Sequence, residues 1–264
     1  MYTHRCDGGE YFVVITSEML QVQKNRIQTE YSCSRPLDLF DSPALERLAT
    51  QAAVGRHLRT SRVLEQLESD QSLDALIHLG KACIAVCLCE DDYPGWISVK
   101  DLAYLEEAPQ QYQPLSVSVA EIRAKIPAAI AFTHAAKNQP NYYLWGGTVA
   151  PNYDCSGLMQ AAFASVGVWL PRDAYQQEAF TQAIAVSDLQ PGDLIFFGTP
   201  QKATHVGLHL GDNHYIHSSG KDQGHNGIAI DVLSDQASRV SQAYYAQLRG
   251  AGRIIAIYQP TQTL

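Results

Sequence analysis

Residues 154–166 read DCSGLMQAAFASV, and this run has the pattern of a helix that begins at a cysteine. Its apolar residues recur every three or four positions, the period of a helix with one buried face: Leu158, Met159, Ala162, Phe163 and Val166. Asp154 is a good N-cap residue and Gly167 a plausible stop. Cys155 therefore falls in the first turn, where unpaired N–H groups and the helix dipole favour a negative sulfur.

Two interpretations of Cys155 compete. Most free cysteines are small buried hydrophobes. A thiol becomes a good nucleophile only when its pKa is lowered or a base removes its proton. The position at a helix start and the Trp145-Gly146-Gly147 lead-in favour the nucleophile.

A hairpin downstream supplies a base. Residues 204–210 alternate polar and apolar, residues 211–213 are turn formers, and residues 214–218 read as the return strand. With a three-residue loop, His217 becomes the diagonal neighbour of His205 on one face. A two-residue loop would put the two histidines on opposite faces.

The apolar pattern selects the three-residue loop. In that register Leu210 faces His214 and His205 faces Ser219. The opposite face is then uniformly apolar and predicts the core side of the hairpin: Val206, Leu208, Leu210 and Ile216.

Four histidines in this stretch raise the question of a metal: His205, His209, His214 and His217. Zinc sites usually show helical or C-x-x-C ligand spacing, and neither occurs here. We therefore predict no metal and no cofactor, and we interpret His209 and His214 as surface or loop-edge residues.

Six ordered motifs together resemble the NlpC-type cysteine peptidases of bacterial cell-wall peptides. They stand between residues 143 and 217: Tyr143-x-Trp145-Gly146-Gly147, Asp154-Cys155-Ser156-Gly157, Leu170-Pro171-Arg172, residues 191–197 (PGDLIFF), His205-Val206-Gly207 and Tyr215-Ile216-His217. The resemblance covers residues 116–264 and implies an α+β, papain-like fold, with the cysteine helix packed on an antiparallel sheet.

By this resemblance Cys155 is the nucleophile, His205 the general base and His217 the residue that orients His205. Tyr143 would help the Cys155 N–H to bind the oxyanion. Asp193, in a turn before a core strand, is interpreted as structural.

The resemblance also suggests four substrate-binding residues: Tyr93, Asp154, Ser156 and Arg172. Asp154 would cap the helix and also hold the free α-ammonium of an N-terminal L-alanine, since a carboxylate accepts several hydrogen bonds. Tyr93 would lie near the amino end of the substrate, although a Tyr-Pro-Gly turn alone predicts only a surface aromatic. Ala174 replaces a serine found in many family members.

Composition bounds the partners. The chain has 264 residues and a net charge of −8, which favours neither nucleic acid nor an anionic wall surface. No apolar run approaches the roughly 20 residues that span a bilayer. Residues 1–30 lack the features of a signal peptide. We expect a cytoplasmic protein without nucleic-acid or membrane partners.

The remaining cysteines fit a reducing compartment. Cys6 and Cys33 stand alone, and Cys83, Cys87 and Cys89 form a C-x3-C-x-C group in a predicted strand. We interpret all of them as core thiols, because the spacing and the missing fourth ligand disfavour zinc.

Four segments are predicted. The first is an extension over residues 1–29. Residues 30–105 contain short strands with closely spaced turns, which predict a small β-barrel. Within it, residues 62–80 read as a helical or loose insertion. Tyr93-Pro94-Gly95-Trp96-Ile97 resembles the closing strands of a bacterial SH3-like domain. Residues 106–115 read as a linker. The peptidase domain follows over 116–264, and a capping box at Ser118 begins a helix that reaches Lys137.

The resemblance implies a γ-D-glutamyl-L-diamino acid endopeptidase. Its expected substrate is L-Ala-γ-D-Glu-meso-diaminopimelate with a free amine, consumed in cell-wall peptide recycling. An N-acetylmuramoyl-L-alanine amidase or another acyl-transfer enzyme on the same fold is the alternative, because a fold does not fix a substrate. A binding module without catalysis ranks last, since both the cysteine and the histidines are present.

Overall fold

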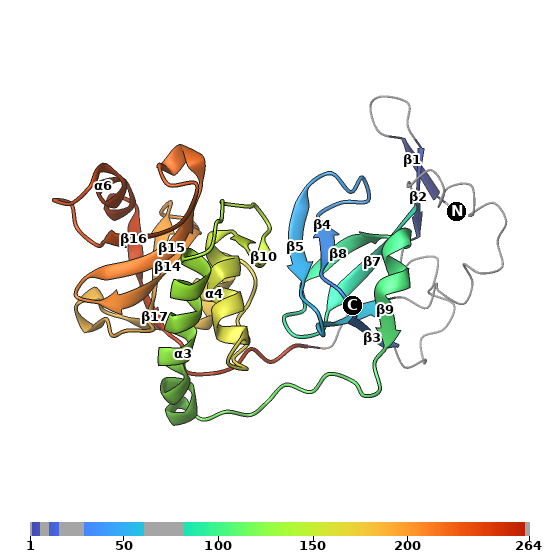
Figure 1. Ribbon diagram of the computed structural model, residues 1–264, viewed down its shortest axis with the longest axis horizontal. Coiled ribbons are helices and arrows are strands. Elements are labelled where there is room, and N and C mark those ends of the chain that lie inside the picture. The colour runs from blue at the N-terminus through green and yellow to red at the C-terminus, as the bar shows by residue number, and fades with distance from the viewer. Residues whose placement is uncertain (1, 6–10, 16–28, 61–81, 262–264) are drawn as a thin grey trace. The chain divides into compact units, whose positions relative to one another are not determined.

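The computed structural model describes residues 2–5, 11–15, 29–60 and 82–261. They form two compact units (Figure 1). The first comprises the described residues up to Gln113 and from Pro260 on, and the second is Pro114–Gln259. Cys6 and the insertion predicted at residues 62–80 lie outside the described residues. Among those described, no helix is both long and apolar enough to cross a bilayer.

A nine-stranded sheet makes up the first unit, and its main path runs β5-β4-β8-β7-β6-β3-β9. The strands are β1 (Tyr2–Arg5), β2 (Tyr11–Ile15), β3 (Glu30–Cys33), β4 (Leu37–Phe40), β5 (Leu48–Ala52), β6 (His57–Thr60), β7 (Ala82–Leu88), β8 (Pro94–Ser98) and β9 (Leu105–Glu107), with the 3-10 helix η2 (Val99–Tyr104) before β9. The short strands predicted near residues 37 and 83 are confirmed as β4 and β7. An SH3-like domain stays a prediction.

The predicted linker begins two residues too early. Residues 106 and 107 belong to β9, which pairs with β3 through Tyr31 and Ser32. Backbone pairing therefore extends a strand into a segment whose polar composition reads as loop.

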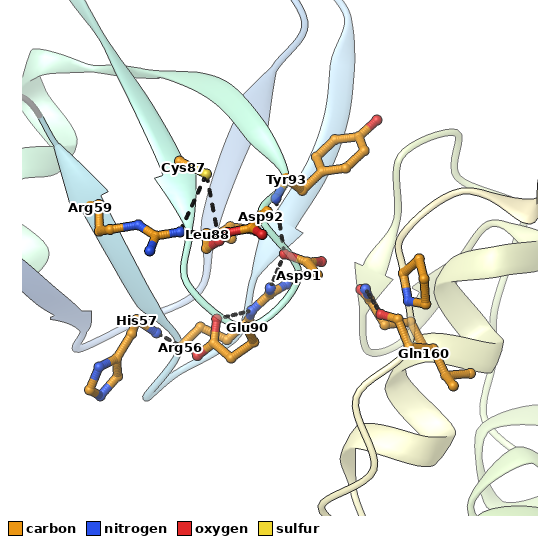
Figure 2. A network of polar contacts seen from close by, with 12 residues as sticks. Arg56, His57, Arg59, Cys87, Leu88, Glu90, Asp91, Asp92, Tyr93 and Gln160 are labelled. Carbon is orange, nitrogen blue, oxygen red and sulfur yellow. Dashed lines mark hydrogen bonds and ion pairs between the residues drawn. The ribbon is translucent and has the colours of Figure 1, made fainter. Parts of the chain in front are cut away.

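The turn after β7 is held by buried charges. Arg56 donates to Glu90 at 3.2 Å and to Asp91 at 2.8 Å, and all three side chains are almost fully buried. Figure 2 shows the guanidinium between the two carboxylates, with Asp91 also accepting the Tyr93 N–H at 3.3 Å. The network fixes the backbone that presents Tyr93.

The second unit packs helices on a six-stranded antiparallel sheet of order β12-β17-β13-β14-β15-β16. Its helices are α3 (Val119–Lys137), α4 (Cys155–Ala164), α5 (Ala174–Phe180) and α6 (Arg239–Tyr245), with 3-10 turns η3 (Val186–Asp188) and η4 (Lys221–Gln223). Its sheet strands are β12 (Gln182–Ile184), β13 (Leu194–Gly198), β14 (Ala203–Gly211), β15 (His214–Ser219), β16 (Gly227–Val232) and β17 (Leu248–Arg253). A separate hairpin, β10 (Thr148–Val149) and β11 (Asn152–Tyr153), precedes α4.

Both predicted helices of this unit are confirmed. Ser118 caps α3 through a reciprocal capping box with Glu121. Asp154 caps α4 by accepting the Gly157 N–H at 2.7 Å. Figure 1 shows α3 and α4 adjacent, and both contribute to the core on one sheet face.

The sheet separates two apolar clusters. Val206, Leu208 and Ile216 pack with α3 and α4, as the sequence predicted for this face of the hairpin. Residues of the opposite phase, among them Phe197 and Tyr215, pack with α6 instead. Strand alternation therefore places the histidine side of the hairpin on the face that α6 covers.

The hairpin keeps the predicted register by a different route. Leu208 pairs with Ile216 and His209 with Tyr215, as predicted, but Gly211 rather than Leu210 pairs with His214. Only two residues, Asp212 and Asn213, form the loop, and both have positive φ, as primed hairpin turns require. A bulge between His209 and Gly211 adds the residue that restores the phase.

Candidate active site

Cys155 is the first residue of α4, and its side chain is buried at 6% exposure. Burial, and after it the neighbouring Asp154 charge, raise the pKa of the thiol to about 12. Backbone N–H groups of Val206 and Ser156 and the Arg172 charge act in the opposite direction but do not prevail. The thiol is therefore protonated at neutral pH.

This result corrects the sequence-based expectation of a stabilised thiolate. The helix-start N–H groups are present, as predicted. Removal of the sulfur from water, however, disfavours the charged form more strongly than these groups favour it. A proton acceptor is consequently needed for nucleophilic attack.

His205, the proton acceptor that the sequence predicts, is the end of a hydrogen-bonded chain. His205 Nε2 lies 2.7 Å from His217 Nδ1, and His217 Nε2 lies 2.9 Å from Asp231 Oδ2. All three side chains are buried. The structure thus brings together the two predicted histidines and adds a carboxylate that the sequence interpretation had not included.

The chain has a defined proton order. Burial alone would raise the pKa of Asp231, but hydrogen bonds from His217 and His225 outweigh it and lower that pKa to about 2. Ionised Asp231 only accepts, so the His217 proton is on Nε2 and its Nδ1 accepts from His205 Nε2. His205 Nδ1 then carries the lone pair that can take the Cys155 proton.

His205 is kept neutral and oriented. Burial, followed by the nearby His217, lowers its pKa well below 6.5. Tyr244 of α6 stacks on the imidazole, with ring centroids 4.4 Å apart and planes at 28°. The Tyr244 hydroxyl in turn hydrogen-bonds Ser219 Oγ at 2.9 Å, which fixes the stacking ring.

Asp154, Ser156 and Arg172 form one buried network. Arg172 donates Nη2 to Asp154 Oδ2 at 2.5 Å and Nη1 to Asp154 Oδ1 at 3.1 Å, and it reaches Ser156 Oγ at 2.9 Å. Asp154 also accepts the Gly146 and Gly157 N–H groups and the Ser156 hydroxyl. Arg172 is 1% exposed, so its observed contacts serve to position Asp154 and the start of α4.

The remaining predicted residues are placed as follows. Tyr143 is half-buried and pairs with Tyr153 in an isolated bridge; burial, then the Cys155 charge, raises the pKa of its hydroxyl, which therefore remains a donor. Tyr93 belongs to the first unit. Asp193 is structural, because it forms a two-contact pair with Arg253 at 2.9 and 2.7 Å.

His209 was assigned wrongly to the surface. It is 4% exposed, and neither ring nitrogen has a hydrogen-bond partner among the described residues. Its strand β14 is internal to the six-stranded sheet and is flanked by β13 and β15. His214, at the start of β15, is exposed as predicted.

Asp231 and Tyr244 were missed, and only the first had a usable signal. Ile228, Ile230 and Val232 alternate with Ala229 and Asp231, which predicts a strand with a carboxylate on its second face. The β15–β16 register opposes Tyr215 to Asp231, so this face is also that of His217. Without that register, the pairing could not be read from the sequence.

Comparison with known proteins shows that the second unit is similar to a known family. Residues 140–249 match the NlpC/P60 family. The chain is 31% identical over 130 residues to the "Bifunctional muramidase/DL-endopeptidase CwlT" of Bacillus subtilis, covering 47% of this chain and 40% of that protein. It is 35% identical over 99 residues to the "Probable endopeptidase p60" of Listeria monocytogenes, covering 38% of this chain and 19% of that protein.

Solved structures also align with the chain. An NlpC/P60 family protein from Bacillus cereus is 20% identical, with 86% of this chain and 64% of that chain covered and a TM-score of 0.42. The peptidoglycan hydrolase RipB from Mycobacterium tuberculosis is 25% identical, with 53% and 69% covered and a TM-score of 0.43. The chain spans two fifths or less of the length of the two curated relatives above.

Proposed function

We propose that this chain, whose residues 140–249 match the NlpC/P60 family, is a cysteine endopeptidase of cell-wall peptides. The observation that carries the proposal is the hydrogen-bonded chain Asp231–His217–His205, whose strand β14 packs against α4, the helix that starts at Cys155. The endopeptidase names of the curated relatives support the class of reaction.

Acylation begins from a neutral pair. As the Cys155 sulfur attacks the substrate carbonyl, its proton passes to His205 Nδ1, and the resulting imidazolium keeps its hydrogen bond to His217. The Cys155 N–H and the Tyr143 hydroxyl donate to the oxyanion. Collapse of the tetrahedral intermediate breaks the C–N bond, and His205 Nδ1–H protonates the leaving amine.

Deacylation reverses the proton path. Water attacks the thioester carbonyl while His205 Nδ1 takes one of its protons. The intermediate expels the sulfur, which regains a proton from His205, and the carboxylic acid leaves. Ionised Asp231 and neutral His217 keep the same His205 nitrogen basic for both half-reactions.

We infer that the scissile bond joins γ-D-glutamate to meso-diaminopimelate in a peptide with a free N-terminal L-alanine. Asp154 would accept the ammonium. Its two oxygens already accept five hydrogen bonds, of which that from the Ser156 hydroxyl, at 3.3 Å, is the longest. An ammonium would therefore take the place of the Ser156 hydroxyl on Oδ1.

A role in recycling of released wall peptides in the cytoplasm follows from that substrate. The amidase alternative requires a site that accepts a sugar on the alanine nitrogen. In the amidase substrate the alanine nitrogen is acylated and carries no charge. It therefore cannot form the charge-assisted hydrogen bond that a carboxylate makes with a free ammonium. The buried Asp154 therefore supports the free peptide.

Single substitutions test the assignment of the nucleophile and the base. We expect Cys155→Ala and His205→Ala each to lower kcat by about 10⁴-fold or more while leaving the unfolding transition unchanged. Peptide hydrolysis followed by chromatography, together with thermal unfolding, measures both. Near-wild-type turnover by either folded variant would refute the proposal.

A further inference from the structure

Three potential metal ligands meet at the outer end of the proton chain. One ring nitrogen of His217, one ring nitrogen of His225 and a carboxylate oxygen of Asp231 all lie within 4.8 Å of one another. Asp231 Oδ2 is 2.9 Å from the first nitrogen and 2.8 Å from the second. Among the described residues this is the one group of histidine, cysteine and acidic side chains with such geometry.

We propose that His217, His225 and Asp231 form a binding site for a divalent transition-metal ion, zinc above all, and that the bound ion switches off catalysis. Two imidazoles and a carboxylate with one position left for water are a donor set that zinc uses. Zinc bonds of about 2.0–2.2 Å put the ligand atoms of a tetrahedral site roughly 3.4 Å apart. The two contacts of Oδ2, at 2.9 and 2.8 Å, must widen by about half an ångström, and the separation between the two histidine nitrogens, which is within 4.8 Å, must shorten toward the same value.

The surroundings permit this adjustment. The His225 side chain is 29% exposed and lies between η4 and β16, which gives an ion a path from solvent. The Asp231 carboxylate is held from its other side, where Oδ1 accepts the Ser241 hydroxyl at 3.3 Å and the Ser238 hydroxyl at 3.5 Å. Such outer partners orient a ligand and leave its second oxygen for the ion.

Metal binding would reverse the proton order. In the chain without metal, His217 carries its proton on Nε2 and His205 carries its own on Nε2. A metal needs the Nε2 lone pair of His217, so that imidazole must carry its proton on Nδ1, which donates to His205 Nε2. The His205 proton then resides on Nδ1.

This rearrangement involves no oxidation or reduction, and the total number of protons on the two imidazoles does not change. Each imidazole keeps one proton, and each proton changes sides: one leaves His217 Nε2 for solvent, one passes from His205 Nε2 to His217 Nδ1, and one from solvent reaches His205 Nδ1. With Nδ1 protonated, His205 no longer accepts the Cys155 proton. The thiol, whose pKa burial raises, stays inert.

The inhibition rests on the proposed function, whereas the metal site does not. Zinc could also inhibit by binding the Cys155 thiol directly. A distinguishing experiment therefore measures binding in a variant without that thiol. Hydrolysis is measured separately.

The binding arm uses calorimetry and competition with a chromophoric zinc chelator. We expect wild type and Cys155→Ala to bind one zinc ion with the same affinity. His225→Gln keeps a hydrogen-bond donor for Asp231 but is a poor metal ligand. It should weaken zinc binding by at least about 10-fold, because loss of a residue that only hydrogen-bonds to a metal ligand already has an effect of that size. His214→Gln is the matched control on an exposed histidine and should bind as wild type does.

The activity arm uses the same proteins with an intact nucleophile. For each protein, activity is measured relative to its own rate without metal, and half-inhibition of His225→Gln should need at least about 10-fold more zinc than wild type. Millimolar magnesium should not inhibit, because it prefers oxygen ligands. The proposal is overturned if His225→Gln binds zinc as tightly as wild type, or if Cys155→Ala abolishes binding.

Discussion

At Cys155, two effects of sequence position act against each other. The first turn of α4 offers N–H groups that favour a thiolate, yet the same packing removes the sulfur from water. Burial prevails and raises the pKa to about 12. Reactivity therefore depends on His205, which burial keeps neutral by lowering its pKa well below 6.5. Thiol and imidazole rest as a neutral pair.

A direct prediction concerns the ionisation of this thiol. Thiolates absorb at 240 nm, so the difference in absorbance between wild type and Cys155→Ser reports one sulfur. We expect no ionisation step between pH 4 and about 9, because the folded-state pKa lies near 12. A step in the acidic range, as an ion-paired cysteine shows, would contradict the neutral pair.

The pH profile of kcat/KM follows from the same groups. His205 must be neutral to act, and its lowered pKa keeps it neutral as the pH falls through 6.5. The acidic limb of the kcat/KM profile, measured with substrate well below KM, should therefore lie below pH 6.5. A limb centred above that value would mean that His205 is solvated or paired with a thiolate.

Among the elements, the turn after β7 is stabilised by one buried side chain. Arg56 compensates both Glu90 and Asp91 away from water. Arg56→Ala should lower the free energy of unfolding of the first unit by about 3–5 kcal/mol, since it leaves buried charges unpaired. Denaturant unfolding measures the change.

A matched control uses an exposed pair. Arg47 lies 3.7 Å from Asp41, with both side chains open to solvent. Arg47→Ala should cost about 1 kcal/mol or less. Equal losses in the two variants would show that the buried network contributes no more than a surface pair.

The hairpin shows how far the sequence predicts an element. Alternation predicted both strands and the common face of His205 and His217, because a wrong phase would expose Val206 and Leu208. It did not predict the bulge at residues 209–211, since a bulge and a longer loop change the phase equally. The positive φ angles of Asp212 and Asn213 mark a two-residue turn, where the alternation predicts a three-residue loop.

Contacts between segments far apart in the chain could not be predicted from the sequence. Helix α4, its cap and α3 could be predicted because their signals are local. The Asp231 pairing and the Tyr244 stacking depend on how β16 and α6 fold back, which no local pattern specifies. The same holds for Arg172, whose partner Asp154 lies 18 residues earlier.

At the scale of the molecule, the catalytic chain lies within one unit. Cys155, His205, His217 and Asp231 all belong to residues 114–259. The net charge of −8 disfavours binding to anionic polymers by the chain as a whole. We propose instead that this unit selects a small peptide with a free amine.

The most direct test compares two substrates by mass spectrometry: L-Ala-γ-D-Glu-meso-diaminopimelate with its amine free, and the same peptide capped by N-acetylmuramic acid. Cys155→Ala serves as the control for contaminating hydrolases. The account predicts cleavage of the free peptide alone, at the bond between D-glutamate and diaminopimelate. Cleavage of the capped peptide, at that bond or between muramic acid and L-alanine, would contradict it.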